Sequence, residues 1–303
     1  WRDRAPAVRK LYVETVAEYL VRLKERETYP ADRMSRYQIV LTADRSSIGA
    51  QAAGWYYFGR NGFADAAKWF RNALDWGPDV NRDPKTAEGL IVSLRNIGRG
   101  DEAETLAWDW RVRSPRFAQL YAEIAADAMS RLAQNATWPS DRLARLAAFA
   151  REAKSAFAAQ SIGWYRAARG DWSEAADWFK LALDLTGEDK DAKTMEGYAL
   201  ALRGLGRIDE AETIAFAWRE RGDAFVSLYL DTVIDQLQKL KPADAYPADR
   251  LANFARLVHD RRHIAGAQAL GWYRLARNEN GDGESWFRNA IAWAGDARDE
   301  KST

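Results

Sequence analysis

Residues 50–76 have the sequence AQAAGWYYFGRNGFADAAKWFRNALDW, and this stretch decides the fold. Its apolar side chains recur at steps of three and four residues, which corresponds to one face of an α-helix. Arg60-Asn61-Gly62 separates two such runs, and Gly77-Pro78 follows the second run. Glycine permits a tight turn, and Gly followed by Pro is typical of a helix end. The stretch therefore predicts a hairpin of two helices.

The same stretch recurs along the chain. Gly54-Trp55-Tyr56 returns as Gly163-Trp164-Tyr165 and again as Gly271-Trp272-Tyr273, at intervals of 109 and 108 residues. Such a period is typical of repeat architectures. We therefore divide the sequence into supra-repeats 1–109, 110–217 and 218–303 and expect one continuous array over residues 1–303. The third copy stops near Lys301, so we expect the chain to be a piece of a longer array.

Two further hairpins complete each supra-repeat. Asp83-Pro84 is expected to open a helix, and Gly98 and Gly206 are expected to separate the helices of hairpins 86–110 and 194–218. A third pair is expected at 117–134 and 140–154, with Trp138-Pro139 in its turn. No segment has the two-residue period of a strand. The sequence predicts an all-α solenoid of stacked helix-turn-helix hairpins in a repeat of about 108 residues.

The hairpin around Gly54 resembles a tetratricopeptide (TPR) repeat, a helix-turn-helix of about 34 residues. The TPR pattern of small and large residues matches six positions here. They are Gly54, Tyr57, Ala66, Phe70, Ala73 and Pro78. The later copies depart from it, since Arg166 stands at the Tyr position and Gly187 at the Pro position. The resemblance covers about two-thirds of the chain and implies a fold. It implies no specific function, because TPR stacks serve many different partners.

Composition excludes several classes of function. Lys and Arg number 45 against 44 Asp and Glu, so the chain lacks the positive charge of a general nucleic-acid binder. Cysteine is absent, which excludes disulfides, zinc–thiolate sites and cysteine nucleophiles. No apolar run is long enough to span a membrane. Tryptophan is the outlier, with fourteen residues.

No combination of residues indicates catalysis. His259 and His263 are four residues apart on an expected helix, a spacing that can bind a metal, but neither recurs in the other copies. Gly281-Asp282-Gly283 is interpreted as a turn between helices. Asp209-Glu210 is interpreted as compensation of a helix dipole, because its acids recur at a helix start. We therefore expect no enzyme activity, no metal and no cofactor.

The recurring Trp–Gln pairs are the candidate binding residues. Trp55, Trp164 and Trp272 each follow the small Gly of a first helix, a position that lines the concave groove in TPR proteins. Four residues earlier stand Gln51, Gln160 and Gln268. An aromatic face with an amide can stack on a sugar ring or hold an extended peptide. The alternative is that these Trp side chains pack against the third hairpin of their own supra-repeat, and one edge could pack while the other stays exposed.

The Trp- and Tyr-rich helices, the absent Cys and the long repeat resemble the periplasmic TPR scaffold of bacterial cellulose and exopolysaccharide export, as in the C component of cellulose synthase. That resemblance implies a periplasmic, non-enzymatic scaffold that contacts synthase or export subunits or guides a glucan chain. The alternatives are a general TPR adaptor, periplasmic or cytoplasmic, that holds a peptide in its groove, and an enzyme whose catalytic module lies outside this segment.

Overall fold

The computed structural model describes residues 6–24, 27–78, 83–132 and 136–299, with side chains up to residue 295. Lys301 and the first residues of supra-repeat 1 lie outside these ranges. The chain forms two compact units, residues 1–146 and residues 147–303. Both are helical, and the described residues contain no strand. None of the described helices has the length and apolar character that would let it cross a membrane.

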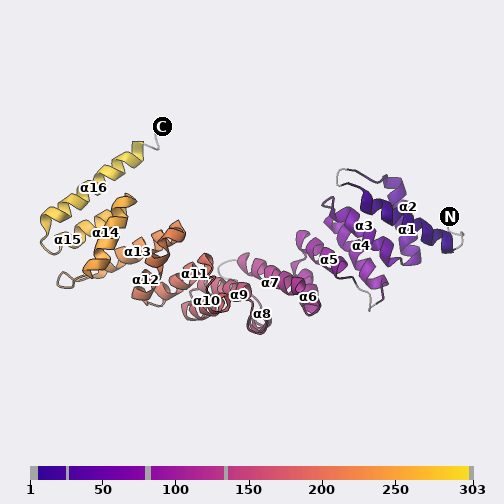
Figure 1. The fold of residues 1–303 in the computed structure, drawn as a ribbon, viewed down its shortest axis with the longest axis horizontal. Helices are drawn as coiled ribbons and strands as arrows, with labels where there is room; N and C mark the ends of the chain where they lie inside the picture. Colours follow the sequence, from indigo (N-terminus) through magenta and orange to yellow (C-terminus); the bar gives the residue numbers. More distant parts are fainter. Residues whose placement is uncertain (1–5, 25–26, 79–82, 133–135, 300–303) are drawn as a thin grey trace. The chain divides into compact units, whose positions relative to one another are not determined.

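Unit 1 consists of antiparallel helices that follow one another in chain order (Figure 1). They are α1 (Pro6–Arg22), α2 (Ala31–Asp44), α3 (Ser47–Phe58), α4 (Phe63–Trp76), α5 (Pro84–Asn96), α6 (Gly100–Trp110), α7 (Pro115–Ser130) and the first part of α8 (Ser140–Glu152). Helix α4 packs between α3 and α5, and α6 packs along α7. The predicted hairpin over residues 50–76 is confirmed as α3 and α4.

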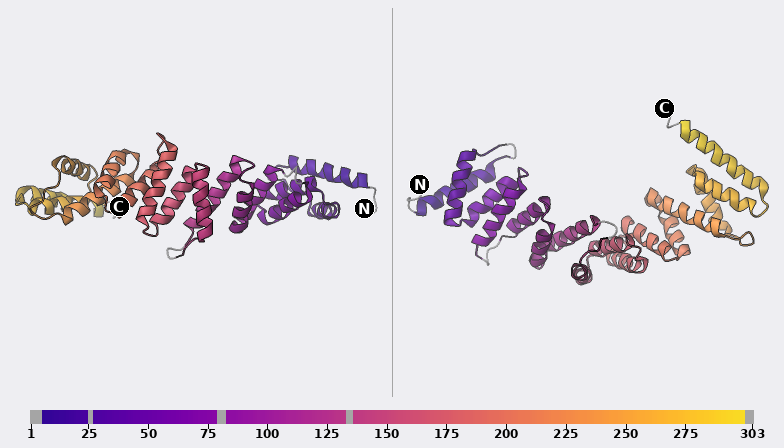
Figure 2. Two further views of the ribbon diagram at one scale, coloured as in Figure 1. Left: turned by 90° about the horizontal axis from the view of Figure 1, so that it is seen from below. Right: turned by 180° about the vertical axis from the view of Figure 1, so that it is seen from behind.

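Unit 2 repeats this pattern (Figures 1 and 2). After the end of α8 come α9 (Ala156–Ala167), α10 (Trp172–Thr186), α11 (Ala192–Gly204), α12 (Ile208–Trp218), a short 3₁₀ helix (Arg219–Arg221), α13 (Asp223–Lys239), α14 (Ala248–Asp260), α15 (Ile264–Leu275) and α16 (Asn280–Asp299). Helix α10 packs between α9 and α11, and α15 packs along α16. Hairpins α9–α10 and α15–α16 are therefore later copies of α3–α4.

Local chemistry determines where the helices begin and end. The Asp83 carboxylate accepts a hydrogen bond from the Thr86 N–H at 3.0 Å and so caps α5, which begins at Pro84. Gly98 and Gly206 separate the paired helices with φ of 78°, in the left-handed region that glycine tolerates best. The acids of α6 and α12 stand in the first turn of each helix, as the sequence predicts.

In hairpins α3–α4 and α9–α10, which we call the inner copies, one aromatic ring contacts three consecutive helices. Phe70 on α4 is fully buried, and its ring lies against Gly54 on α3 and Gly89 on α5. A Cβ added at Gly54 would lie 2.5 Å from the ring, and one at Gly89 would lie 2.7 Å from it. These distances are too short for any side chain, so the two glycines allow both neighbouring helices to approach the ring. Phe179 in unit 2 has the same environment between glycines of α9 and α11.

A buried carboxylate anchors each of the helices α8 and α14. Glu104 and Glu212 are each 2% exposed and bind Arg142 and Arg250, respectively. Glu212 also accepts a hydrogen bond from the Tyr246 hydroxyl at 2.6 Å. Burial and this hydrogen bond raise the pKa of Tyr246. These pairs explain why Glu and Arg recur at a fixed separation of 38 residues.

Three local predictions need correction. Helix α7 ends at Ser130 and not at residue 134. Gly281-Asp282-Gly283 lies in the first turn of α16, because Asn278, with φ of 62°, already completes the turn before it. His259 and His263 do not share a helix, because α14 ends at Asp260.

Candidate functional site

Trp55 and Trp164 are half-buried and contact the central Phe of their own hairpin. The Trp55 ring meets Phe70 edge to face, with centroids 4.8 Å apart, and the Trp164 ring meets Phe179 in the same way at 5.1 Å. Lys193 of α11 lies 4.6 Å from the centre of the Trp164 ring. Neither the central Phe nor Lys193 belongs to the third hairpin of a supra-repeat, against which these Trp side chains would pack in the alternative interpretation. Both indoles therefore pack within their own hairpin, and Trp164 also contacts α11 of the next hairpin.

Trp272 has a different environment. Its ring meets Phe287 with centroids 5.1 Å apart, as in the other copies, but the side chain is 64% exposed. It borders an apolar hollow of about 400 Å³ between α15 and α16. Of the three predicted Trp residues, Trp272 alone has a largely accessible indole.

Gln51 and Gln160 take part in helix capping. The Gln51 amide nitrogen donates hydrogen bonds to Asp83 at 2.6 Å and Thr86 at 2.8 Å, at the start of α5. Gln160 makes the same pair of hydrogen bonds, both at 2.7 Å, to the first turn of α11 and its capping Asp191. Gln268 is exposed. The amides of the two inner copies thus help to attach the next helix, and ligand binding by the Trp–Gln pairs stays a prediction.

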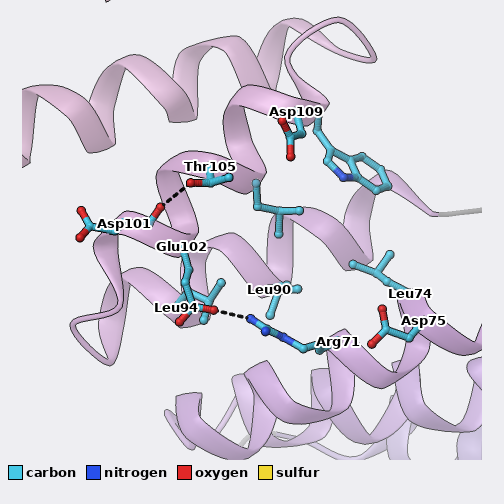
Figure 3. A pocket seen from close by; sticks show the side chains of 11 residues that line it. Arg71, Leu74, Asp75, Leu90, Leu94, Asp101, Glu102, Thr105 and Asp109 are labelled. Carbon is cyan, nitrogen blue, oxygen red and sulfur yellow. Dashed lines mark hydrogen bonds and ion pairs between the residues drawn. The ribbon is translucent and has the colours of Figure 1, made fainter. Parts of the chain in front are cut away.

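A hollow with mixed polarity lies elsewhere, between α4 and α6. It has a volume of about 530 Å³ and an apolar floor (Figure 3). Four leucines and a tryptophan form this floor: Leu74, Leu90, Leu94, Leu106 and Trp110. We call this hollow the α4–α6 groove. Helix α5 lies at its base, and the two outer helices form its sides.

Carboxylates surround the floor of the α4–α6 groove. Arg71 on α4 pairs with Glu102 on α6 at 2.9 Å, and Figure 3 shows Asp75 on α4 and Asp109 on α6 on opposite sides of the floor. Hydrogen bonds from Arg99 and Arg71 lower the pKa of Glu102, so this group stays ionised at neutral pH. Among the described residues, neither Asp75 nor Asp109 forms an ion pair. The groove therefore combines an apolar base with carboxylates on both of its sides.

Four of the corresponding positions of unit 2 carry a different residue, and two of these changes alter the size or the charge of the lining. Tyr198 stands where unit 1 has Leu90, and Ala217 stands where unit 1 has Asp109. The Tyr198 ring is larger than the Leu90 side chain, and one of the two carboxylates is lost, whereas Asp184 keeps the other at the position of Asp75. Sequence analysis missed this groove because its lining residues look like ordinary core and surface positions. Comparison of the two supra-repeats at these positions is the signal that could have identified it.

The histidines have structural roles. His263 caps α15, and its Nδ1 accepts a hydrogen bond from the Gly266 N–H at 3.1 Å, as Ser46 and Ser155 cap α3 and α9. The His259 ring lies 6.1 Å from that of Trp293. Within the described ranges, no group of three His, Cys, Asp or Glu side chains is arranged to hold a metal ion.

The described residues form stacked helix-turn-helix hairpins, and two solved TPR structures are similar to this chain over part of its length. A TPR protein from Parabacteroides merdae matches with a TM-score of 0.45 and 11% identity, covering 81% of this chain and 98% of that one. A thermophilic TPR protein from Thermus thermophilus matches with a TM-score of 0.33 and 20% identity, covering 62% and 97% of the two chains. No family model matches the sequence, and no curated protein is significantly similar to it.

Proposed function

We propose that this chain is a non-enzymatic scaffold that binds another polypeptide in the α4–α6 groove. The observation that carries the proposal is the apolar floor of this groove together with the carboxylates of Asp75 and Asp109 on its two sides. Stacked helical repeats offer extended binding surfaces because each hairpin packs only on its neighbours. The ligand that fits is a segment with apolar side chains for the floor and Lys or Arg side chains for the carboxylates of Asp75 and Asp109.

The physical chemistry favours a peptide over a small polar ligand. Apolar side chains that leave water for the leucine floor supply the binding energy, about 25 cal/mol for each Å² of apolar surface buried. The two carboxylates add orientation, since charge complementarity contributes more to specificity than to affinity. Exposed ion pairs contribute about 0.2–1 kcal/mol each and weaken as salt rises.

The test is selection of short random peptides that are displayed on phage, with wild-type chain as the target. Peptides are counter-selected against the Leu90→Tyr variant, which carries the residue that unit 2 has at this position. We expect enriched peptides to combine apolar residues with Lys or Arg. Leu90→Tyr is expected to weaken their binding about tenfold or more, because it fills the groove. No enrichment, or equal binding to the variant, would contradict the proposal.

Charge is tested with a second pair of variants. The double variant Asp75→Asn, Asp109→Asn is expected to weaken binding of a selected peptide about twofold to tenfold. Asp65→Asn is the matched control, because Asp65 is an exposed carboxylate on α4 outside the groove. An equal effect of the control would show that the overall charge of the chain, and not the two carboxylates of the groove, determines affinity.

A second candidate function is a periplasmic scaffold of cellulose or exopolysaccharide export that contacts a glucan chain. It is favoured by the exposed indole of Trp272 beside the exposed Gln268. Soluble cello-oligosaccharides titrated against Trp fluorescence test it, with Trp272→Ala compared with Trp55→Ala and Trp164→Ala. A glucan site requires a response that Trp272→Ala removes, and no response to any oligosaccharide would reject this function.

A further inference from the structure

The α15–α16 hairpin carries an uncovered apolar face. Ile291 is 73% exposed, whereas Leu74 and Leu183 at the same position of the earlier copies are each 7% exposed. The exposure of Trp differs in the same way, since Trp272 is largely exposed and Trp55 is half-buried. A side chain that is core in two copies and exposed in the third indicates a missing packing partner and not a solvent-adapted surface.

The inner copies show what covers this face. In unit 1 it is α5, and in unit 2 it is α11. The sequence that enters α5 is DPKTAEG over residues 83–89, and the sequence that enters α11 is DAKTMEG over residues 191–197. Both covering helices therefore begin with the pattern Asp-x-Lys-Thr-x-Glu-Gly.

Two contacts explain that pattern. The glycine places backbone against the central ring, because a Cβ at Gly197 would lie only 2.4 Å from the ring of Phe179. The Asp and Thr side chains at the helix start accept hydrogen bonds from Gln160. In this pattern the Gly packs on the Phe ring of the covered hairpin, and the Asp and Thr accept hydrogen bonds from its Gln amide.

The last hairpin presents the receiving half of the same contact. Gly271 packs against one side of the Phe287 ring, since a Cβ added at Gly271 would lie 2.7 Å from the ring. The other side faces the hollow of about 400 Å³, with Gln268 and Trp272 along α15 and Ile291 along α16. Figures 1 and 2 show α16 lying along α15, and no described helix of unit 2 lies on this open side.

We propose that the open face of α15–α16 is a docking site for a helix that begins Asp-x-Lys-Thr-x-Glu-Gly. The helix would place its glycine on Phe287 and its capping Asp and Thr against the Gln268 amide. A second copy of this chain does not supply that helix, because its α5 and α11 already hold their glycines on Phe70 and Phe179. This site is separate from the α4–α6 groove and does not depend on it.

The probe is a fluorescein-labelled synthetic peptide of residues 190–221, which carries α11 and α12, and binding to the whole chain is followed by fluorescence anisotropy. We expect saturable binding that a Gly197→Leu peptide loses by about tenfold or more, because the added side chain meets the Phe ring. Ile291→Asp in the chain is expected to weaken binding to a similar extent. Val112→Asp is the matched control, since Val112 is 80% exposed and lies in unit 1.

A fused chain removes the requirement that the isolated peptide be helical. Residues 192–221 are joined directly after Asp299, which occupies the same repeat position as Asp191. Hydrogen exchange of residues 264–295 is then expected to slow, relative to the same fusion with Gly197→Leu in the added segment. Equal exchange in the two fusions, together with a peptide that does not bind, would overturn the proposal.

Other occupants give distinct results that would also overturn it. Self-association of the chain alone that Ile291→Asp abolishes, measured by analytical ultracentrifugation, would assign the face to a second copy. Binding of cello-oligosaccharides that Trp272→Ala abolishes, without peptide binding, would assign it to a glucan. Peptide binding that Ile291→Asp leaves unchanged would place the peptide elsewhere on the chain.

Discussion

Substitution of equivalent glycines tests the packing of the repeat most closely. Gly163 and Gly271 occupy the same position of α9 and α15, and a Cβ added at either would lie 2.8 or 2.7 Å from the ring of the next helix. The two rings differ in what lies behind them. Phe179 is fully buried with Gly197 on its far side, whereas Phe287 is half-buried and faces an open hollow.

The magnitudes follow from this difference. Alanine is favoured over glycine within a helix by about 0.8–1 kcal/mol. An extra methyl in a closed core costs about 1–3 kcal/mol. At Gly163 the ring cannot move, so we expect Gly163→Ala to destabilise α9 by about 1 kcal/mol. At Gly271 the ring can shift into the hollow, and we expect Gly271→Ala to leave α15 unchanged or to stabilise it by up to about 1 kcal/mol.

Native-state hydrogen exchange is the suitable assay, because repeat proteins open hairpin by hairpin and a single unfolding midpoint averages over them. Protection of α9 in Gly163→Ala is compared with protection of α15 in Gly271→Ala. Phe179→Leu should relieve the cost of Gly163→Ala, since it removes the ring. Equal costs at the two positions would refute the reasoning that closure of the far side of the ring determines the result.

Two further predictions concern charged groups. Glu212→Ala is expected to lower the free energy of unfolding by about 3 kcal/mol, since Arg250 and Tyr246 lose a buried partner. Asp209→Ala, at an exposed carboxylate, should cost less than about 1 kcal/mol, and urea titration of both variants measures the two losses. Partial burial alone would raise the pKa of Asp191, but hydrogen bonds from Thr194 and Gln160 lower it below the ordinary value of 3.8. The stability that ionised Asp191 contributes is thus complete above pH 3.8 and is lost as the pH falls through the lower native value. The stability difference between wild type and Asp191→Asn should therefore shrink below pH 3.8, and a constant difference would contradict this.

The hairpins were predictable because their signals are local. Three- and four-residue periods, the Asp83-Pro84 start and the turn glycines Gly98 and Gly206 each act within a few residues of the chain. Phe70 was also identified as a packing residue from the TPR resemblance, and its full burial agrees. The array of residues 1–303 as one continuous solenoid stays a prediction.

The candidate site was less predictable because exposure depends on which helix comes next. Trp164 and Trp272 have the same neighbours in sequence, yet the first is half-buried and the second is 64% exposed. Helix α11 covers the first hairpin, and no described helix covers the second. The role of Gln160 was likewise hidden, since its partners lie 31 and 34 residues away. The α4–α6 groove depends on Leu90. The small size of this side chain becomes apparent only when it is compared with Tyr198, the residue at the same repeat position in unit 2.

The most direct test of the scaffold function is hydrogen exchange of the wild-type chain with and without a saturating selected peptide. Binding in the α4–α6 groove predicts slower exchange in residues 63–76 and 84–110, with little change in residues 172–218. Protection in residues 172–218 instead, or no protection in residues 63–110, would contradict the claim that this groove is the polypeptide-binding site.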